Sequence, residues 1–130
     1  MIINKDNNLL ILLGPTGVGK TDISIKIAQK TPDIEIISAD SMQIYKYMDI
    51  GTAKPDKSTL NAIKHHMIDI VDPSENFDVI RYSKLAADAI SDVFERGKIP
   101  ILAGGSGLYI SSIVNPLFKG PARDLSLIHI

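Results

Sequence analysis

An eight-residue segment, residues 14–21 with the sequence GPTGVGKT, restricts the possible folds of this chain more than any other feature. It matches the pattern G-x-x-x-x-G-K-[ST] at every fixed position, and it follows a continuous apolar run over residues 9–13. Backbone N–H groups in such a loop surround a phosphate, and the helix that follows adds the positive end of its dipole. The segment therefore predicts a buried strand, a loop that binds a diphosphate or triphosphate, and a helix.

Each position of this phosphate loop has a physical role. Its glycines allow the backbone to approach the ligand closely, Lys20 supplies a full positive charge, and the Thr21 hydroxyl can coordinate Mg²⁺. A glycine-rich turn with an incidental lysine is the alternative, which the complete match and its strand–helix context disfavour. The candidate phosphate-binding residues are Gly14, Pro15, Thr16, Gly17, Val18, Gly19, Lys20 and Thr21.

Short apolar runs alternate with amphipathic segments along the chain, as in α/β layered proteins. Strands are expected over residues 9–13, 34–39, 66–71 and 99–103, and helices over 20–30, 79–96 and from 107 onward. Parallel strands would bring the loops after Leu13, Ala39 and Ala103 to one sheet edge, where such folds bind ligands. We expect a three-layer, P-loop NTPase-like fold with a mostly parallel sheet and flanking helices.

Composition narrows the class of protein. The 130 residues, of which 45% are hydrophobic, suffice for one domain with its own core. No apolar run approaches the roughly 18–20 residues of a membrane span, so no membrane partner is expected. The chain has no cysteine, which fits a cytoplasmic protein. A net charge of −1 gives no overall attraction to nucleic acid, so a polyanion has to be held locally or by residues outside this chain.

Asp40 is the best candidate for acid–base chemistry. It follows the second expected strand directly and begins the polar segment 40–43 (DSMQ). A carboxylate at this edge can hold a water molecule of a Mg²⁺ shell or accept a proton from a nucleophile. An aspartate there can equally cap the next helical turn, and the residues alone leave both interpretations open.

Other acidic and metal-binding candidates are weaker. The strand over 99–103 ends in Gly104 rather than in an acid, and Asp69 falls within an expected strand, so a hydrolytic motor is disfavoured. His65 and His66 are adjacent and point to different sides, so packing or hydrogen bonding is expected of them rather than metal binding.

Five segments stand in an order that resembles one family, the tRNA dimethylallyltransferases, over roughly residues 9–118. The resemblance implies transfer of a dimethylallyl group from dimethylallyl diphosphate to N6 of an adenosine beside the tRNA anticodon. Diphosphate is released and Mg²⁺ assists. The segments are GPTGVGKT (14–21), DSMQIY (40–45), MDIGTAKP (48–55), HHMID (65–69) and GGSGLYI (104–110).

The resemblance also implies roles for single residues. The phosphate loop would hold the leaving diphosphate, Asp40 would accept the proton of the attacking amine, and Thr16 would contact the substrate near the reacting carbon. Ser106 stands where the family more often has threonine. The positions that match tRNA-contacting residues are Asp40, Ser41, Met42, Gln43 and Ser106. The residues themselves give Lys54 no role.

Members of this family are much longer than this chain, so most of the tRNA-gripping surface is expected outside it. We expect residues 1–123 to form a truncated N-terminal P-loop domain that is inactive alone. The tail over 124–130 does not resemble the family's continuation. A small P-loop nucleotide kinase or an adenylate isopentenyltransferase would use the same loop with a free nucleotide. A non-enzymatic nucleotide-binding module would bind ATP without turnover.

Overall fold

The computed structural model describes residues 8–13, 20–48, 54–115 and 124–129 of the chain. The strands are β1 (Asn8–Leu13), β2 (Ile34–Ser38), β3 (His65–His66), β4 (Ile99–Ala103) and β5 (Asp124–His129). The helices are α1 (Lys20–Lys30), α2 (Lys57–Ala62), α3 (Val79–Glu95) and α4 (Gly107–Val114). None of the helices in these ranges has the length and apolar character that a membrane crossing requires.

The described strands form one sheet in the order β3-β2-β4-β1-β5, and every neighbouring pair is parallel. Ile101 of β4 is in register with Leu10 of β1 on one side and with Ile36 of β2 on the other. Because the strands are parallel, β1, β2 and β4 all end at the same edge of the sheet. This is the arrangement that the alternating sequence pattern predicts.

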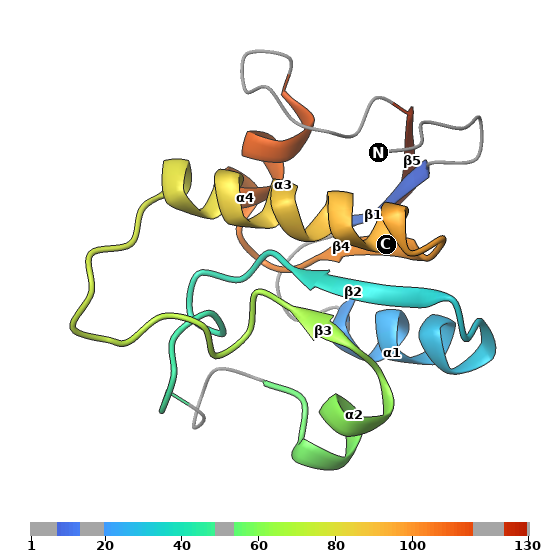
Figure 1. Cartoon of the computed structure of the whole chain (residues 1–130), viewed down its shortest axis with the longest axis horizontal. Coiled ribbons are helices and arrows are strands. Elements are labelled where there is room, and N and C mark those ends of the chain that lie inside the picture. The colour runs from blue at the N-terminus through green and yellow to red at the C-terminus, as the bar shows by residue number, and fades with distance from the viewer. Residues whose placement is uncertain (1–7, 14–19, 49–53, 116–123, 130) are drawn as a thin grey trace.

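Helices cover both faces of the sheet (Figure 1). α1 packs on one face, and α3 and α4 pack together on the other. β2 is buried along its whole length, as a central parallel strand should be. Its Ile36 belongs to the core beneath α1, whereas Ile37 belongs to the core beneath α3. The expected three-layer architecture, a parallel sheet with flanking helices, is confirmed.

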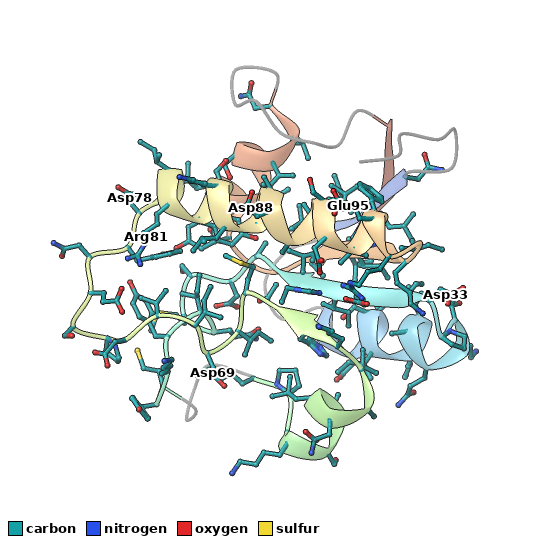
Figure 2. All side chains as sticks on the ribbon, in the orientation of Figure 1. Asp33, Asp69, Asp78, Arg81, Asp88 and Glu95 are labelled. Atoms are coloured by element: carbon teal, nitrogen blue, oxygen red, sulfur yellow. The ribbon has the colours of Figure 1, made fainter. Side chains whose placement is uncertain are left out.

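α3 is the longest described helix, and its bounds agree with the predicted range. The Asp78 carboxylate caps its first turn by accepting a hydrogen bond from the Arg81 backbone N–H at 2.8 Å. Gly97 follows its end with a φ of +71°, a left-handed conformation that glycine adopts without strain. Asp88 and Glu95 lie on the outer, exposed face of the helix (Figure 2).

The prediction of a third strand over 66–71 is wrong beyond its first residue. β3 covers only His65–His66, because Met67 and Asp69 adopt left-handed φ angles of 68° and 56° that turn the chain away from the sheet. Val71 pairs instead with Tyr45 in an isolated parallel bridge. The alternation of apolar residues in this stretch reflects burial in a loop, since Met67 and Val71 are both buried.

Two elements were not predicted. α2 buries none of its residues, so its sequence carries no apolar periodicity, and the Asp56 cap that starts it is its main local signal. β5, in the segment 124–129, pairs with β1 along its full length, although no strand is expected there from the sequence. The predicted domain boundary at residue 123 stays a prediction.

A partly buried ion-pair network joins β2, β3 and the end of α3. The Glu35 side chain is 8% exposed, and its carboxylate accepts hydrogen bonds from Arg96, just past α3, at 2.5 and 2.7 Å. The His66 ring Nε2 lies 2.7 Å from the same carboxylate. The Arg96 hydrogen bonds, helped by His66, lower the pKa of Glu35 from 4.5 to about 2 despite its burial.

This network makes a prediction about acid stability. Because the pKa of Glu35 is lowered on folding, its contribution is complete above about pH 4.5 and is lost as the pH falls towards 2. We expect wild type to lose about 2 kcal/mol more than Glu35→Gln over that interval. Urea unfolding followed by circular dichroism at several pH values measures this difference. Equal losses in the two proteins would contradict the network's role.

Candidate functional site

The loops that follow β2 and β4 are joined through their backbones at the carboxyl edge of the sheet. The Ala39 N–H donates to the Ala103 carbonyl at 2.8 Å, and the Ser106 N–H donates to the Ala39 carbonyl at 3.0 Å. Gly104 lies against this crossing so closely that a Cβ atom there would stand 2.2 Å from the Ala39 carbonyl oxygen. Only glycine therefore fits at position 104, and the two loops hold a fixed relation.

Asp40 extends directly from this crossing. Its Oδ1 accepts hydrogen bonds from the backbone N–H groups of Met42, at 2.8 Å, and Gln43, at 3.1 Å. The capping interpretation of Asp40 is thus confirmed for one of its two oxygens. Both bonds use Oδ1, so they fix the orientation of the carboxylate without involving Oδ2. An orientation fixed in this way is compatible with acid–base chemistry at the other oxygen.

The three residues after Asp40 differ in exposure. Ser41 and Met42 are exposed, the latter at 44%, so both present side chains at this edge. Gln43 is only 6% exposed, and its Oε1 accepts a hydrogen bond from the Ser38 hydroxyl at 3.1 Å. Gln43 therefore supports the loop from inside. A tRNA contact by any of the three stays a prediction.

A stacked pair of tyrosines supports the crossing from the α3 side. The fully buried Tyr82 hydroxyl donates to the Ser38 carbonyl at 2.8 Å, at the end of β2. Its ring stacks on Tyr109 with the centroids 3.9 Å apart. Burial raises the pKa of Tyr82, so its hydroxyl keeps its proton and remains a donor. Sequence reasoning missed this support, because the hydroxyl's partner is 44 positions away.

Ser106 starts α4. Its hydroxyl oxygen accepts a hydrogen bond from the Tyr109 N–H at 3.3 Å, as an N-cap does, while its own N–H bonds to Ala39. The structure therefore brings Ser106 and the Asp40 loop together, as the parallel-strand argument predicts. Its proposed contact with tRNA is a separate prediction.

The predicted phosphate loop lies mostly outside the described residues. Gly14, Pro15, Thr16, Gly17, Val18 and Gly19 belong to that stretch, as do the side chains of Lys20 and Thr21. The elements on either side agree with the prediction, because β1 ends at Leu13 and α1 begins at Lys20. β1 therefore ends at the sheet edge that also carries Asp40. The predicted approach of Asp40 to a bound diphosphate stays a prediction.

The two histidines have structural partners on different sides of β3. His66 belongs to the Glu35 network, whereas the His65 Nδ1 lies 2.9 Å from the Ile63 carbonyl, to which it donates. Burial lowers the pKa of His65, which favours its neutral form. Within the described ranges, no group of three or more His, Cys, Asp or Glu side chains is placed to hold a metal ion.

Comparison with known proteins gives matches over most of the chain. The family model described as IPP transferase matches residues 43–127. The tRNA dimethylallyltransferase of Fervidobacterium nodosum is 55% identical over 115 residues, which are 88% of this chain and 37% of that protein. This chain thus spans little more than a third of that relative's length.

Two solved structures are similar in both fold and sequence. One is tRNA delta(2)-isopentenylpyrophosphate transferase from Staphylococcus epidermidis, with a TM-score of 0.74 and 50% identity over 81% of this chain and 34% of that one. The other is full-length tRNA isopentenylpyrophosphate transferase from Bacillus halodurans, with a TM-score of 0.79 and 43% identity over 91% of this chain and 39% of that one. These likenesses confirm the expected P-loop NTPase-like fold class.

The backbone crossing predicts opposite effects for two nearby glycine substitutions. Gly104→Ala should lower the free energy of unfolding by about 1–3 kcal/mol, the usual cost of overpacking, because its Cβ collides with Ala39. Gly107→Ala is the control, because a Cβ atom there meets nothing within 4 Å. Position 107 is the first residue of α4, where alanine favours the helix more than glycine does, so this variant should not lose stability. Urea unfolding measures both, and equal effects would contradict the close contact.

Proposed function

Since this chain belongs to the IPP transferase family, we propose that the full-length protein containing it is a tRNA dimethylallyltransferase. It transfers a dimethylallyl group from dimethylallyl diphosphate to N6 of an adenosine beside the tRNA anticodon. The relatives and solved structures that the chain resembles are named as transferases acting on tRNA. The observation that carries the proposal is the oriented Asp40 carboxylate, at the sheet edge where β1 also ends.

Asp40 acts as the general base in the proposed reaction. The adenosine N6 attacks the carbon that bears the diphosphate, a C–N bond forms, and the C–O bond to the leaving group breaks. The proton released from N6 passes to Asp40. Placing such a base is worth about 10²–10⁴-fold in rate. The adenine has to leave its stack to reach a site at this edge.

The phosphate loop binds the leaving group in this proposal. Diphosphate gains negative charge as the C–O bond breaks, and Lys20 together with the loop's N–H groups stabilises that charge. Thr16 contacts the substrate near the reacting carbon. These roles come from the family resemblance and the matched motif.

Mg²⁺ is the proposed cofactor, and its role is to neutralise charge on the diphosphate. Thr21 would hold it. The residue lies in the first turn of α1, which begins where the phosphate loop ends. A threonine hydroxyl is a hard oxygen donor of the kind that Mg²⁺ prefers, so the residue type at this position fits the ion.

tRNA is the proposed partner, bound largely through regions outside this chain. Within it, Ser41 and Met42 are exposed beside Asp40, and Ser106, the N-cap of α4, bonds to Ala39, which precedes Asp40. The net charge of −1 gives this part little general attraction for RNA, so the remaining length has to supply the phosphate contacts. A cytoplasmic location agrees with this substrate.

The test compares acceptors. The full-length protein is given labelled dimethylallyl diphosphate, Mg²⁺ and either an anticodon stem-loop or free AMP. Transfer to the stem-loop supports the proposal. Transfer to AMP alone supports an adenylate isopentenyltransferase, phosphoryl transfer from ATP supports a kinase, and ATP binding without turnover supports a binding module. Calorimetric titration with dimethylallyl diphosphate and with ATP, each with and without Mg²⁺, shows which of the two group donors the protein binds.

Asp40→Asn separates the chemical role of this residue from its structural one. Asparagine keeps an oxygen for the Met42 and Gln43 N–H groups but cannot accept the proton. We expect kcat to fall by about 10²–10⁴-fold while dimethylallyl diphosphate binding and thermal stability stay nearly unchanged. Asp40→Ala should lose the same activity and also about 1 kcal/mol of stability, because the cap is lost.

Asp56→Asn is the matched control for this substitution. Asp56 caps α2 in a similar way, because its Oδ1 accepts from the backbone N–H three residues on, that of Thr59, at 2.8 Å, and it is not part of the proposed site. Its activity should equal that of wild type. A similar activity loss in both variants, or parallel loss of diphosphate binding in Asp40→Asn, would argue against the base role.

A further inference from the structure

Lys54 is a buried lysine beside the Asp40 loop, and its contacts give it a role that its sequence context does not suggest. Its side chain is 5% exposed. The Nζ atom donates to the Tyr45 carbonyl at 2.6 Å and forms an ion pair with the Asp69 carboxylate. Burying an ammonium group is costly unless it is paired. Lys54 therefore connects two segments that are distant from each other in sequence.

These two segments, 42–48 and 67–71, run side by side and are hydrogen-bonded through their backbones. Figure 2 labels Asp69 on the connection that leads from β3 towards α3. Asp69 and the residues after it donate to the segment that follows Asp40, which donates back at Val71. The bonds are Asp69 N–H to Gln43 C=O (3.1 Å), Ile70 N–H to Ile44 C=O (2.9 Å) and Lys46 N–H to Val71 C=O (2.9 Å).

A continuous path of polar contacts links Lys54 to Asp40. Lys54 pairs with the Asp69 carboxylate, and the Asp69 N–H bonds to the Gln43 carbonyl. The Gln43 N–H then bonds to Oδ1 of Asp40 at 3.1 Å. Every step is a direct contact between described atoms. The path therefore joins the Lys54 ammonium to the Asp40 carboxylate through two intermediate residues.

The two segments that Lys54 connects adopt backbone conformations that need support. Asp69, with a φ of 56°, and Tyr47, with a φ of 67°, are both in the left-handed region, which costs free energy for residues other than glycine. Such conformations persist only where the surrounding contacts enforce them. The Lys54 ammonium, bonded to both segments, is one of these contacts. This explains why a charged side chain is buried at this place.

We propose that Lys54 is a positioning residue for the transfer reaction, which fixes Asp40 through Asp69 and Gln43. This inference rests on the proposed function, because it assigns Lys54 to the same site. The phosphate loop is not part of the path, so Lys54 should affect the acceptor side of the reaction and leave binding of dimethylallyl diphosphate unchanged.

Kinetics of Lys54→Met in the full-length protein test the proposal. We expect kcat to fall by about 10²-fold, the cost of misplacing a reacting group by about 1 Å. The KM for the anticodon stem-loop should rise, because Ser41 and Met42 move with Asp40, while the KM for dimethylallyl diphosphate stays the same. A role in stability alone would lower the active fraction and change neither KM, and that result would overturn the proposal.

Two further variants sharpen this test. Lys57→Met removes the same charge from an exposed side chain on α2 and should behave as wild type. If the KM for the stem-loop rose equally in Lys57→Met and Lys54→Met, the loss of one positive charge anywhere on this surface would explain the effect. That result would overturn the proposal. Asp69→Asn removes the ion pair but keeps the backbone bonds, and its side chain is half-exposed, so it remains informative if Lys54→Met does not fold. The double variant should lose no more than Lys54→Met, and additive losses would contradict the path.

Hydrogen exchange separates this inference from the proposed function. The amide protons of Lys46, Asp69 and Ile70 should exchange faster in Lys54→Met than in wild type. In Lys57→Met their exchange rates should equal those of wild type. Unchanged protection in Lys54→Met would overturn the positioning role whatever the activity. A wild-type protein that transfers nothing to the stem-loop would refute the proposed function, while the exchange result would still decide whether Lys54 holds the two segments together.

Discussion

The close backbone contact between Ala39 and Gly104 is the constraint on which the arrangement of the site depends. Two parallel strands, β2 and β4, end side by side, and their loops cross where a Cβ atom at position 104 would stand 2.2 Å from a carbonyl oxygen. The loops therefore cannot shift independently. Asp40 on one loop and Ser106 on the other gain a fixed separation from the backbone, before any side chain contributes.

Side chains then refine what the backbone crossing establishes. Tyr82 holds the Ser38 carbonyl from the α3 side, and Gln43 bonds to the Ser38 hydroxyl. The Asp40 loop is thus supported from β2, from α3 and, through Asp69, from the segment after β3. Such preorganisation is what a general base requires, because it removes the cost of ordering the group at the moment of reaction.

Sequence reasoning succeeded where a feature depends on local patterns. The range predicted for α3 agrees with the structure because its apolar spacing and both its ends are encoded in neighbouring residues. The shared edge of Asp40 and Ser106 followed from parallel strands alone. The turn after His66 was missed, because apolar alternation cannot show that Met67 and Asp69 adopt left-handed φ angles.

Features that depend on distant partners were beyond the sequence. Gln43 and Lys54 are polar residues near a candidate site, a pattern that equally fits a ligand contact and an internal support. The distinction comes from Ser38, Tyr45 and Asp69, whose proximity only the folded chain establishes. The same holds for Gly104, whose requirement for glycine comes from Ala39 and not from its own turn.

The charged groups of the described chain divide according to what holds them. Glu35, near the start of β2, is paired with Arg96, and Asp69 is paired with Lys54 beside the site. The bonds that the structure describes at Asp40 come from two backbone N–H groups, and both end on Oδ1. They orient the carboxylate through one of its oxygens. The proton transfer proposed for this residue can therefore take place at the other oxygen.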